Sequence, residues 1–481
     1  MDPSVLLPLL AMTPMAIAFT LPLISRFTGK RFIDYYFIIA STLMFALAFT
    51  TVTGTPNTIR YFFAGWPPPI GIAYVLTPSV KVLLFYSSLV FFLTSIYTSW
   101  YARHYDNRYL LYTMILGLEA GFNGVLLTSD LFNLYVMLEV SGISAYVLVA
   151  YYSDRFKAVV SSLKYSITGV IVLNFFLLGI LFVYIDAHVL YLDALKEEIL
   201  EPSVYTTISL ALFVWTALFL SAIFPNHFWL PDAHADAPTP VSALLSGIIV
   251  INGAIVFLKT ITIYRNGLLE SLSGFLSYLL PFSALYAAFL MATSNDVKRI
   301  LAYSTIVNTS LAFMGLSLQS VEGVSAGFFH LLTHMIGKAL VFLSIGVFVH
   351  ETKARNIYAL EGYGRMYPIA LLTLTSGALS LTGLPPFAGF FSKLYLYQAL
   401  IESDRHWQAL VVIVVSATSL YAYMRIIEHL WHIPIHEHVI PRKHLSPRAV
   451  LTLLALITLL IILGLMTESL IAALRMSWMA Y

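Results

Sequence analysis

The sequence contains no cysteine, and that absence removes several kinds of chemistry at once. None of its 481 residues is Cys, which excludes disulfides, thiolate-held iron–sulfur clusters, covalently attached haem and cysteine nucleophiles. An ATP-binding loop, a dinucleotide fingerprint and a nucleophile triad are also missing from the sequence. We therefore expect no catalytic residue, cofactor or metal site in this chain, and any electrons would be carried by another subunit.

Charged residues are scarce as well. They make up 10% of the sequence against 59% hydrophobic residues, and the mean hydropathy is +0.85. A soluble fold could not cover its surface with so few charges. The apolar runs predict an all-α polytopic membrane protein of about fourteen transmembrane helices, among them runs centred near Phe213, Leu311 and Leu379. The net charge is only +2 and the basic residues are scattered over loops, so the expected partner is the lipid bilayer and not nucleic acid.

The basic residues also predict an orientation, since cytoplasmic loops collect Lys and Arg. Most of them follow the odd-numbered spans, including Lys30, Lys157, Lys298 and Lys353, whereas the opposite loops hold few. This bias predicts a multi-pass protein of the cell membrane with both termini on the outer side. The first span lacks a basic leading region and an evident cleavage site, which favours a retained helix over a signal peptide.

Proline interrupts two of the predicted spans at comparable places in the two halves. The first break reads SAIFPNHFWLPDA, with Pro225 and Pro231, and the second reads LTGLPPFAGFFSKLYL, with Pro385 and Pro386. In lipid such breaks are tolerated where protein or water satisfies the freed backbone groups, so a pair of them predicts two repeated halves, each with a site near the midplane. Polar residues beside the first break, such as His234, are expected to line a watered entrance or cap helix ends and not to bind a metal.

One apolar stretch of the second half carries the three ionisable residues His330, His334 and Lys338, spaced four apart. On a helix this spacing stacks them along one face, roughly 6 Å apart in rise. Ionisable groups inside a membrane are costly and therefore indicate function, and Lys393 also lies deep in a predicted span. These four residues are the candidate proton pathway of the second half.

The first half has a different set of ionisable residues. Glu119 and Glu139 lie near the middle of adjacent predicted spans, where a lone carboxylate would need a partner or would take up a proton. Glu139 is a candidate for the proton pathway, and Glu119, Lys164 and Lys259 are auxiliary candidates. The two lysines lie close enough to span ends to snorkel, which is the simpler interpretation of both.

Four long segments resemble a known family, the antiporter-like subunits shared by respiratory complex I, Mrp cation antiporters and archaeal membrane-bound hydrogenases or sulfane sulfur reductases. They are DLFNLYVMLEVSGISAYVL around Glu139, WLPDAHADAPTPVSALLSG from 229 to 247, HLLTHMIGKALVFL from 330 to 343, and GLPPFAGFFSKL from 383 to 394. Four segments in the right order are more specific than a single short motif.

This resemblance implies fourteen helices with two inverted five-helix repeats. The implied boundaries are helices 1–3 in 1–108, the first repeat in 109–263, the second repeat in 264–430, and a loop with the last helix in 431–481. It also implies that Glu139 pairs with a lysine of the seventh span, that His330, His334 and Lys338 link the two ends of the second half, and that Lys393 is its terminal lysine.

The sequence departs from the family pattern in the first half. The lysine expected on the seventh span falls at Leu220, the histidine that some members have on the eighth span falls at Ser246, and the lysine of others falls at Ile251. Without a nearby cation Glu139 would be largely neutral. Lys259 shares a helix with Ile251 but lies about two turns further along, roughly 12 Å away.

We therefore expect a subunit of a multisubunit redox-driven complex (hydrogenase, sulfur-reducing or complex I-like) that takes part in H⁺ or Na⁺ translocation, with a degraded first half-channel. Its expected partners are other antiporter-like and small Mrp-like membrane subunits and peripheral redox subunits, which would hold iron–sulfur or nickel–iron centres. An Mrp-type antiporter subunit is one alternative. Two further alternatives belong to another functional class. One is a stand-alone secondary transporter for a solute, and the other is a structural subunit that couples its neighbours but does not conduct ions.

Overall fold

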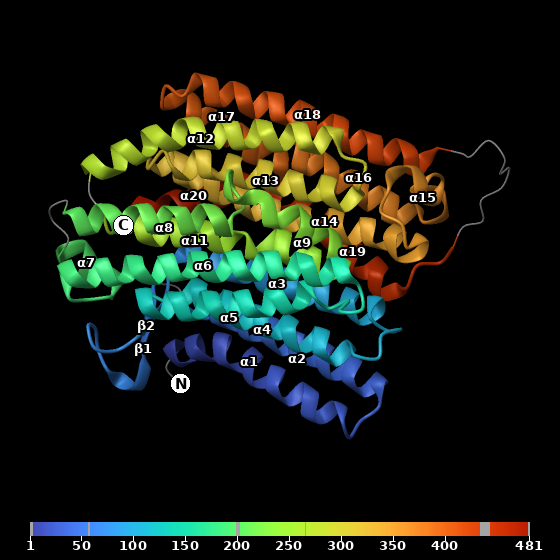
Figure 1. The fold of residues 1–481 in the computed structure, drawn as a ribbon, viewed down its shortest axis with the longest axis horizontal. Helices are drawn as coiled ribbons and strands as arrows, with labels where there is room; N and C mark the ends of the chain where they lie inside the picture. The colour runs from blue at the N-terminus through green and yellow to red at the C-terminus, as the bar shows by residue number, and fades with distance from the viewer. Residues whose placement is uncertain (1–2, 56–57, 199–202, 265, 433–442, 480–481) are drawn as a thin grey trace. The chain divides into compact units, whose positions relative to one another are not determined.

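The computed structural model describes residues 3–55, 58–198, 203–264, 266–432 and 443–479, and nearly all of them are helical (Figure 1). Eleven helices within these ranges are long and apolar enough to cross a membrane, and two shorter apolar helices, Val204–Leu220 and Pro368–Thr382, accompany them. The prediction of an all-α, multi-pass membrane protein is confirmed. The loop expected after residue 431 falls largely on 433–442, outside the described residues.

The expected number of about fourteen spans exceeds the eleven long apolar helices for an identifiable reason. The runs near Phe213 and Leu379 form the two shorter helices, because each of these helices stops at a break. The run near Leu311 forms Val297–Leu316, which carries the buried polar residues Thr305, Asn308 and Ser310. A helix surrounded by protein does not need an apolar face for lipid, so its hydropathy is lower. The number of spans stays a prediction.

The chain divides into two compact units. Unit 1 comprises Met1–Phe92, Tyr105–Ala222 and Ile248–Phe275, and unit 2 comprises Leu93–His104, Ile223–Gly247 and Leu276–Tyr481. In unit 1, α4 packs between α1 and α5, and α11 packs against α4 and α8 (Figure 1). The main elements of unit 1 are α1 Leu6–Ser25, α2 Lys30–Thr53, the antiparallel strands β1 Ile59–Phe62 and β2 Ala73–Leu76, most of α3 Pro78–Tyr101, α4 Arg108–Leu127, α5 Leu131–Val149, α6 Phe156–Ala187, α7 Leu192–Glu198, α8 Val204–Leu220 and α11 Ile251–Ile261.

Unit 2 is built around α14, which packs against α10, α13, α16, α17, α19 and α20. The elements of unit 2 are α9 Trp229–Asp236, α10 Thr239–Leu244, most of α12 Asn266–Thr293, α13 Val297–Leu316, α14 Val321–Thr352, α15 Tyr363–Met366, α16 Pro368–Thr382, α17 Ala388–Glu402, α18 His406–Trp431, α19 Pro447–Leu465 and α20 Thr467–Met479. Because α14 is surrounded on so many sides, its side chains from Gly323 to Phe348 are buried. Polar groups on this helix must therefore find partners inside the protein.

Both predicted breaks are present, and each is followed by a new helix. After α8, Ala222 has a left-handed φ of 52°, and the chain passes Pro225 before α9 begins at Trp229. After α16, Gly383 has a φ of 88° and donates its N–H to the carbonyls of Leu379 and Ser380. A residue in this conformation closes a helix, and glycine adopts it without a steric penalty.

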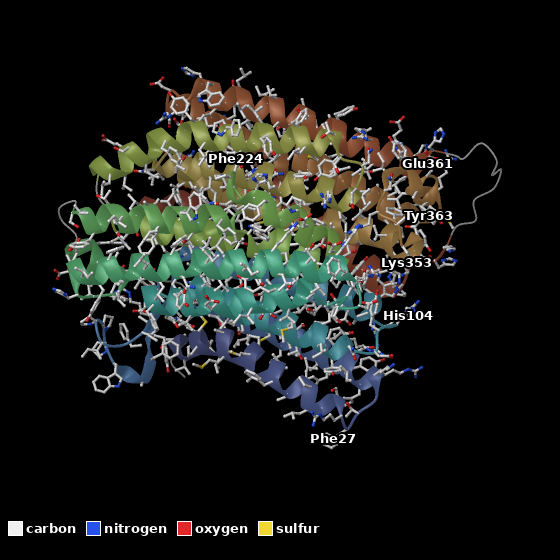
Figure 2. All side chains as sticks on the ribbon, in the orientation of Figure 1. Phe27, His104, Phe224, Lys353, Glu361 and Tyr363 are labelled. Atoms are coloured by element: carbon white, nitrogen blue, oxygen red, sulfur yellow. The ribbon has the colours of Figure 1, made fainter. Side chains whose placement is uncertain are left out.

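Polar residues of loops and of the short helix α15 gather at one end of unit 2. Figure 2 shows His104, Lys353, Glu361 and Tyr363 at the end where α14 stops, with Phe224 of the first break away from it. Lys353 closes α14 with a left-handed φ of 56°. The basic loops predicted to be cytoplasmic include Lys353, so this end is the predicted inner side.

Candidate functional site

The ionisable residues predicted on one helical face do lie on a single helix, α14. Ser320 caps its first turn, because the Ser320 hydroxyl accepts the N–H of Gly323 at 3.1 Å. The helix then runs unbroken to Thr352. His330, His334 and Lys338 are all buried along it, so the structure brings the three predicted residues into one row inside unit 2.

His330 faces α17, the helix that follows the second break. Its Nδ1 forms a 3.0 Å hydrogen bond with the hydroxyl of Ser392, and Thr333 donates to the same hydroxyl at 3.1 Å. The other ring nitrogen, Nε2, has no partner among the described residues. A buried nitrogen of this kind is costly unless water reaches it, which makes it suited to proton exchange.

His334 and Lys338 have their partners on other elements, the π-helical turn Leu245–Ile249 and α13. His334 Nε2 donates to the carbonyl of Ser246 at 3.0 Å, because a carbonyl can only accept, and Nδ1 is left as an unpartnered acceptor. Lys338 Nζ donates to the carbonyl of Leu301 at 2.8 Å. Lys338 has an exposed fraction of 0% and forms no ion pair with any described residue.

A chain of hydroxyl groups connects these two sites. The Thr305 hydroxyl donates to the Leu301 carbonyl at 3.1 Å and shares a 2.6 Å hydrogen bond with the Ser246 hydroxyl. Lys338 and His334 are thus joined through Leu301, Thr305 and Ser246. Ser246 is the position to which the resemblance assigned a histidine, and here its hydroxyl and carbonyl both belong to the network.

Lys393 lies on α17 directly after Ser392, the partner of His330. Its ammonium donates to the Ser416 hydroxyl of α18 at 2.8 Å. The side chain is buried. All four residues predicted for the second half therefore lie in the interior of unit 2, on two helices that pack against each other.

Sequence reasoning missed Lys298, which was counted among loop residues. It lies in the first turn of α13 with an exposed fraction of only 3%, and its ammonium donates to the carbonyls of His234 at 3.2 Å and Ala237 at 2.5 Å. The ring of buried His234 has no hydrogen-bond partner on either nitrogen within the described ranges. The DVKR segment at the start of an apolar helix was the available signal, because a lysine there can extend inward as easily as outward.

The acidic residues beside the first break are engaged in ion pairs. Asp236 pairs with Arg355 at 3.0 Å, and Asp232 pairs with Arg299 at 2.7 Å. Arg355 also contacts Asp296 at 3.4 Å. Within the part of the chain that the structure describes, no group of three or more His, Asp or Glu side chains is arranged to hold a metal ion.

In unit 1 the two predicted glutamates have no cationic partner. Glu139, on α5, is partly exposed and is hydrogen-bonded to the Tyr135 hydroxyl one turn earlier. Glu119, on α4, is buried. Neither carboxylate forms an ion pair with a described residue. The structure thus does not join them to a charge network like the row on α14.

The two auxiliary lysines of unit 1 have different surroundings. Lys164 is exposed on α6. Lys259, on α11, donates to three backbone carbonyls at the C-terminal end of α4, those of Val125 at 2.8 Å, Leu126 at 3.0 Å and Thr128 at 2.5 Å. A cation at this end of a helix satisfies free carbonyls and complements the helix dipole. In this structure Lys259 caps a helix and does not contact Glu139.

The two positions to which the resemblance assigned lysines, Leu220 and Ile251, are apolar. Leu220 is the last residue of α8, and Ile251 is the first residue of α11, where it is fully buried. The next residue, Asn252, donates its amide to the Ser141 hydroxyl of α5 at 3.2 Å. A neutral polar contact therefore connects α11 with α5.

Comparison with known proteins places this arrangement in context. The profile of the NADH:quinone oxidoreductase/Mrp antiporter transmembrane family matches residues 128–420. Subunit N of the NADH-quinone oxidoreductase of Desulforudis audaxviator is 31% identical over 395 residues, which are 80% of this chain and 77% of that relative.

Solved structures agree in fold. A chain of the membrane-bound sulfane sulfur reductase, an archaeal respiratory membrane complex, has a TM-score of 0.90 and 29% identity, with 98% of this chain and 97% of that chain covered. A chain of the Mrp complex from Dietzia sp. has a TM-score of 0.89 and 22% identity, with 99% and 97% covered. The second likeness is one of fold alone.

Proposed function

Because this chain belongs to the NADH:quinone oxidoreductase/Mrp antiporter family, we propose that it is the antiporter-like, ion-translocating membrane subunit of a multisubunit complex. The transported ion is H⁺, Na⁺ or both. The pathway uses His330, His334, Lys338 and Lys393 of unit 2. The energy comes from a neighbouring redox reaction, because this chain has no residues for such chemistry.

The buried network around Lys338 is the observation that carries this proposal. An ammonium group bound by a single carbonyl, with no carboxylate beside it, is easily converted between its charged and neutral forms. His334 has an unpartnered acceptor nitrogen one turn away, and His330 has another unpartnered nitrogen one turn further. Each of these three side chains can take up and release a proton, and each lies one turn from the next. A proton can therefore pass from one to another along the helix through water between them.

The first half contributes less to conduction in this proposal. Glu139 has no cationic partner among the described residues, and Lys259 is bound to α4. Leu220 and Ile251 stand where the resemblance implies lysines. We propose that unit 1 transmits conformational or electrostatic change from a neighbouring subunit. These same features favour the second candidate, a coupling subunit that does not conduct at all.

The finer organisation follows the family. The chain would have fourteen transmembrane helices, both termini on the outer side of the cell membrane, and inverted repeats in 109–263 and 264–430. The likeness in fold over nearly the whole chain and the two helix breaks support this arrangement.

The proposed complex is a hydrogenase, sulfur-reducing or complex I-like assembly, with iron–sulfur or nickel–iron centres in its peripheral subunits. To test this, the chain would be tagged and purified from its native membrane in mild detergent, and stoichiometric companions identified by mass spectrometry. Redox subunits among the companions support the proposal. Small membrane partners alone would indicate an Mrp-type antiporter, and recovery of the chain alone would indicate a solute transporter.

Conduction is tested by replacing Lys338 with Ala in the intact complex. Ion pumping in proteoliposomes, followed separately for H⁺ and Na⁺, should fall by at least tenfold while the redox activity of detergent-solubilised complex persists. The control is Lys443→Ala, which removes an exposed lysine that pairs with Glu351 at 3.4 Å. Unchanged pumping by Lys338→Ala would contradict conduction through unit 2 and leave the non-conducting candidate.

A further inference from the structure

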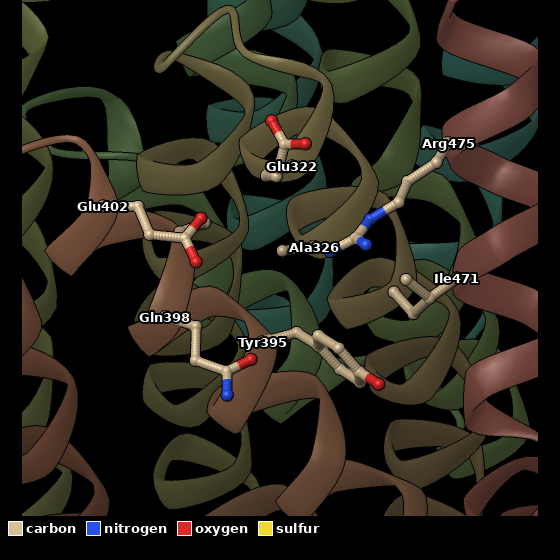
Figure 3. A pocket seen from close by; sticks show the side chains of 8 residues that line it. Glu322, Ala326, Tyr395, Gln398, Glu402, Ile471 and Arg475 are labelled. Atoms are coloured by element: carbon tan, nitrogen blue, oxygen red, sulfur yellow. The ribbon is translucent and has the colours of Figure 1, made fainter.

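A small cavity lies at the end of unit 2 where α14 begins. It is about 20 Å³ in volume, room for about one water molecule. Figure 3 shows that its walls come from α14, α17 and α20. We call it the outer vestibule, and the residues that line it are Glu322, Ala326, Tyr395, Gln398, Ala399, Glu402, Ile471 and Arg475. None of them belongs to the row of ionisable residues on α14 that the sequence predicted, His330, His334 and Lys338.

The vestibule nevertheless continues that row along α14. Glu322 and Ala326 precede His330 at the same four-residue spacing that separates His330, His334 and Lys338. On a helix such residues follow one another along a single ridge. Ala326 therefore lies one turn before His330, roughly 6 Å along the axis, and Glu322 lies two turns before it.

The second wall, on α17, shows the same continuity. Ser392 binds His330, and Tyr395, Ala399 and Glu402 follow at spacings of three and four residues, which place them on one face of the helix. The cavity therefore starts one turn beyond the hydrogen bond between His330 and Ser392. The two helices that hold His330 and its partner Ser392, α14 and α17, thus both continue from this hydrogen bond into the walls of the cavity.

The third wall supplies a positive charge opposite the two acids. Arg475 of α20 lies across the cavity from Glu402, and Figure 3 shows its guanidinium reaching toward Ala326. The Nε atom of Arg475 is buried and has no hydrogen-bond partner in the described part of the chain. No ion pair joins Arg475 to Glu322 or Glu402 in this structure. The three charged side chains therefore line the same cavity without direct contact between opposite charges.

We propose that the outer vestibule is the outer mouth of the pathway through unit 2. It is a site for a monovalent cation at Glu322 and Glu402, with Arg475 as a fixed positive charge that limits access to His330. The carboxylates receive a proton from His330 through water, or bind Na⁺ with their oxygens. Arg475 raises the electrostatic energy of a cation in the vestibule, which shortens its stay there whichever way it moves. This proposal rests on the proposed function and deepens it.

The absence of native cysteine makes a direct test available, because a single introduced thiol is the only one in the chain. Gln398→Cys places a thiol at the exposed side of the vestibule, and Ala472→Cys, on the exposed face of α20, is the matched control. The intact complex in oriented proteoliposomes is treated with a membrane-impermeant cationic methanethiosulfonate from each side. We expect the thiol of Gln398→Cys to react from the outer side only and pumping then to fall at least fivefold, while modification of Ala472→Cys leaves pumping unchanged.

Charge selectivity gives a second, independent readout. The rate at which the cationic reagent labels the introduced thiol is divided by the rate for an anionic reagent of similar size. Glu322→Gln or Glu402→Gln should each lower this ratio, and Arg475→Gln should raise it. A unit charge about 8 Å away in a water-like dielectric changes the rates of the two reagents by about 2.4-fold in opposite directions, so the ratio should change roughly sixfold. Ala326→Cys, deeper in the vestibule, serves if Gln398→Cys does not assemble.

The outcomes separate this inference from the function beneath it. If Lys338→Ala stops pumping but the vestibule thiol is unreachable from outside, or its modification leaves pumping unchanged, the vestibule proposal is overturned and the proposed function stands. If Lys338→Ala leaves pumping unchanged, the proposed function fails and the vestibule is not a mouth of a pathway, whatever its charge preference. Separate H⁺ and Na⁺ fluxes identify which cation the vestibule releases.

Discussion

Replacing Lys259 with Met tests whether this buried lysine holds the structure or carries protons. The change removes an ammonium group that donates to the carbonyls of Val125, Leu126 and Thr128, while it keeps most of the length and apolar volume of the side chain. Two of those carbonyls belong to the last turn of α4, where no backbone N–H is available within the helix. The variant would leave them unsatisfied inside unit 1.

The cost follows from these contacts. Hydrogen bonds to charged groups contribute about 1.5–3 kcal/mol, and leaving a buried acceptor unpaired costs about 1–3 kcal/mol. The three bonds share one donor group and water can replace part of them, so we expect a total loss of about 2–4 kcal/mol. For a unit of this size that corresponds to a fall of roughly 5–10 °C in melting temperature.

The assay is a thermal unfolding scan of the purified complex, combined with pumping per folded complex well below the melting temperature. A helix-capping role predicts a lower melting temperature with near-normal pumping, and Lys443→Met, at an exposed position, should change neither. If Lys259→Met abolished pumping and left the melting temperature unchanged, the capping argument would be refuted. Lys259 would then act as the cationic partner missing from the first half.

Three further outcomes can be measured in the same complex. Glu139→Gln should leave pumping within about twofold of normal, because the carboxylate has no cationic partner to switch; a tenfold loss would show that the first half is active. Ser392→Ala should reduce pumping several-fold, because it removes the hydroxyl bound to Nδ1 of His330, whereas Ser392→Thr should restore it. Leu220→Lys should be tolerated, because Leu220 lies at a partly exposed helix end. Ile251→Lys should lower the yield of assembled complex, because it buries a charge at a cost of several kcal/mol. Equal yields of the two variants would contradict this reasoning.

Features that depend on nearest neighbours along the chain were predictable from the sequence. The membrane class follows from hydropathy, the two breaks follow from proline, and the row of His330, His334 and Lys338 follows from a four-residue spacing on one helix. These properties are local, so they do not depend on how the helices pack. The resemblance to a known family rested on local segments for the same reason, and the comparisons confirm it.

The partners of the ionisable groups could not be predicted, and Lys298 is the clearest example. A lysine beside a helix start can point to water or to the interior, and only the packing of α13 against α9 decides that it binds the carbonyls of His234 and Ala237. Lys259 is similar, since its sequence position indicated snorkelling, whereas its ammonium caps α4 in the structure.

The sequence by itself determined which residues share a helix and that the helices lie in a membrane. The tertiary structure alone decided which helix end receives each lysine, which hydroxyls join His334 to Lys338, and that a cavity with two carboxylates and an arginine lies one turn beyond His330. The physical reason is that spacing along a helix is fixed by its covalent geometry. Contacts between helices depend instead on the packing of side chains far apart in the chain.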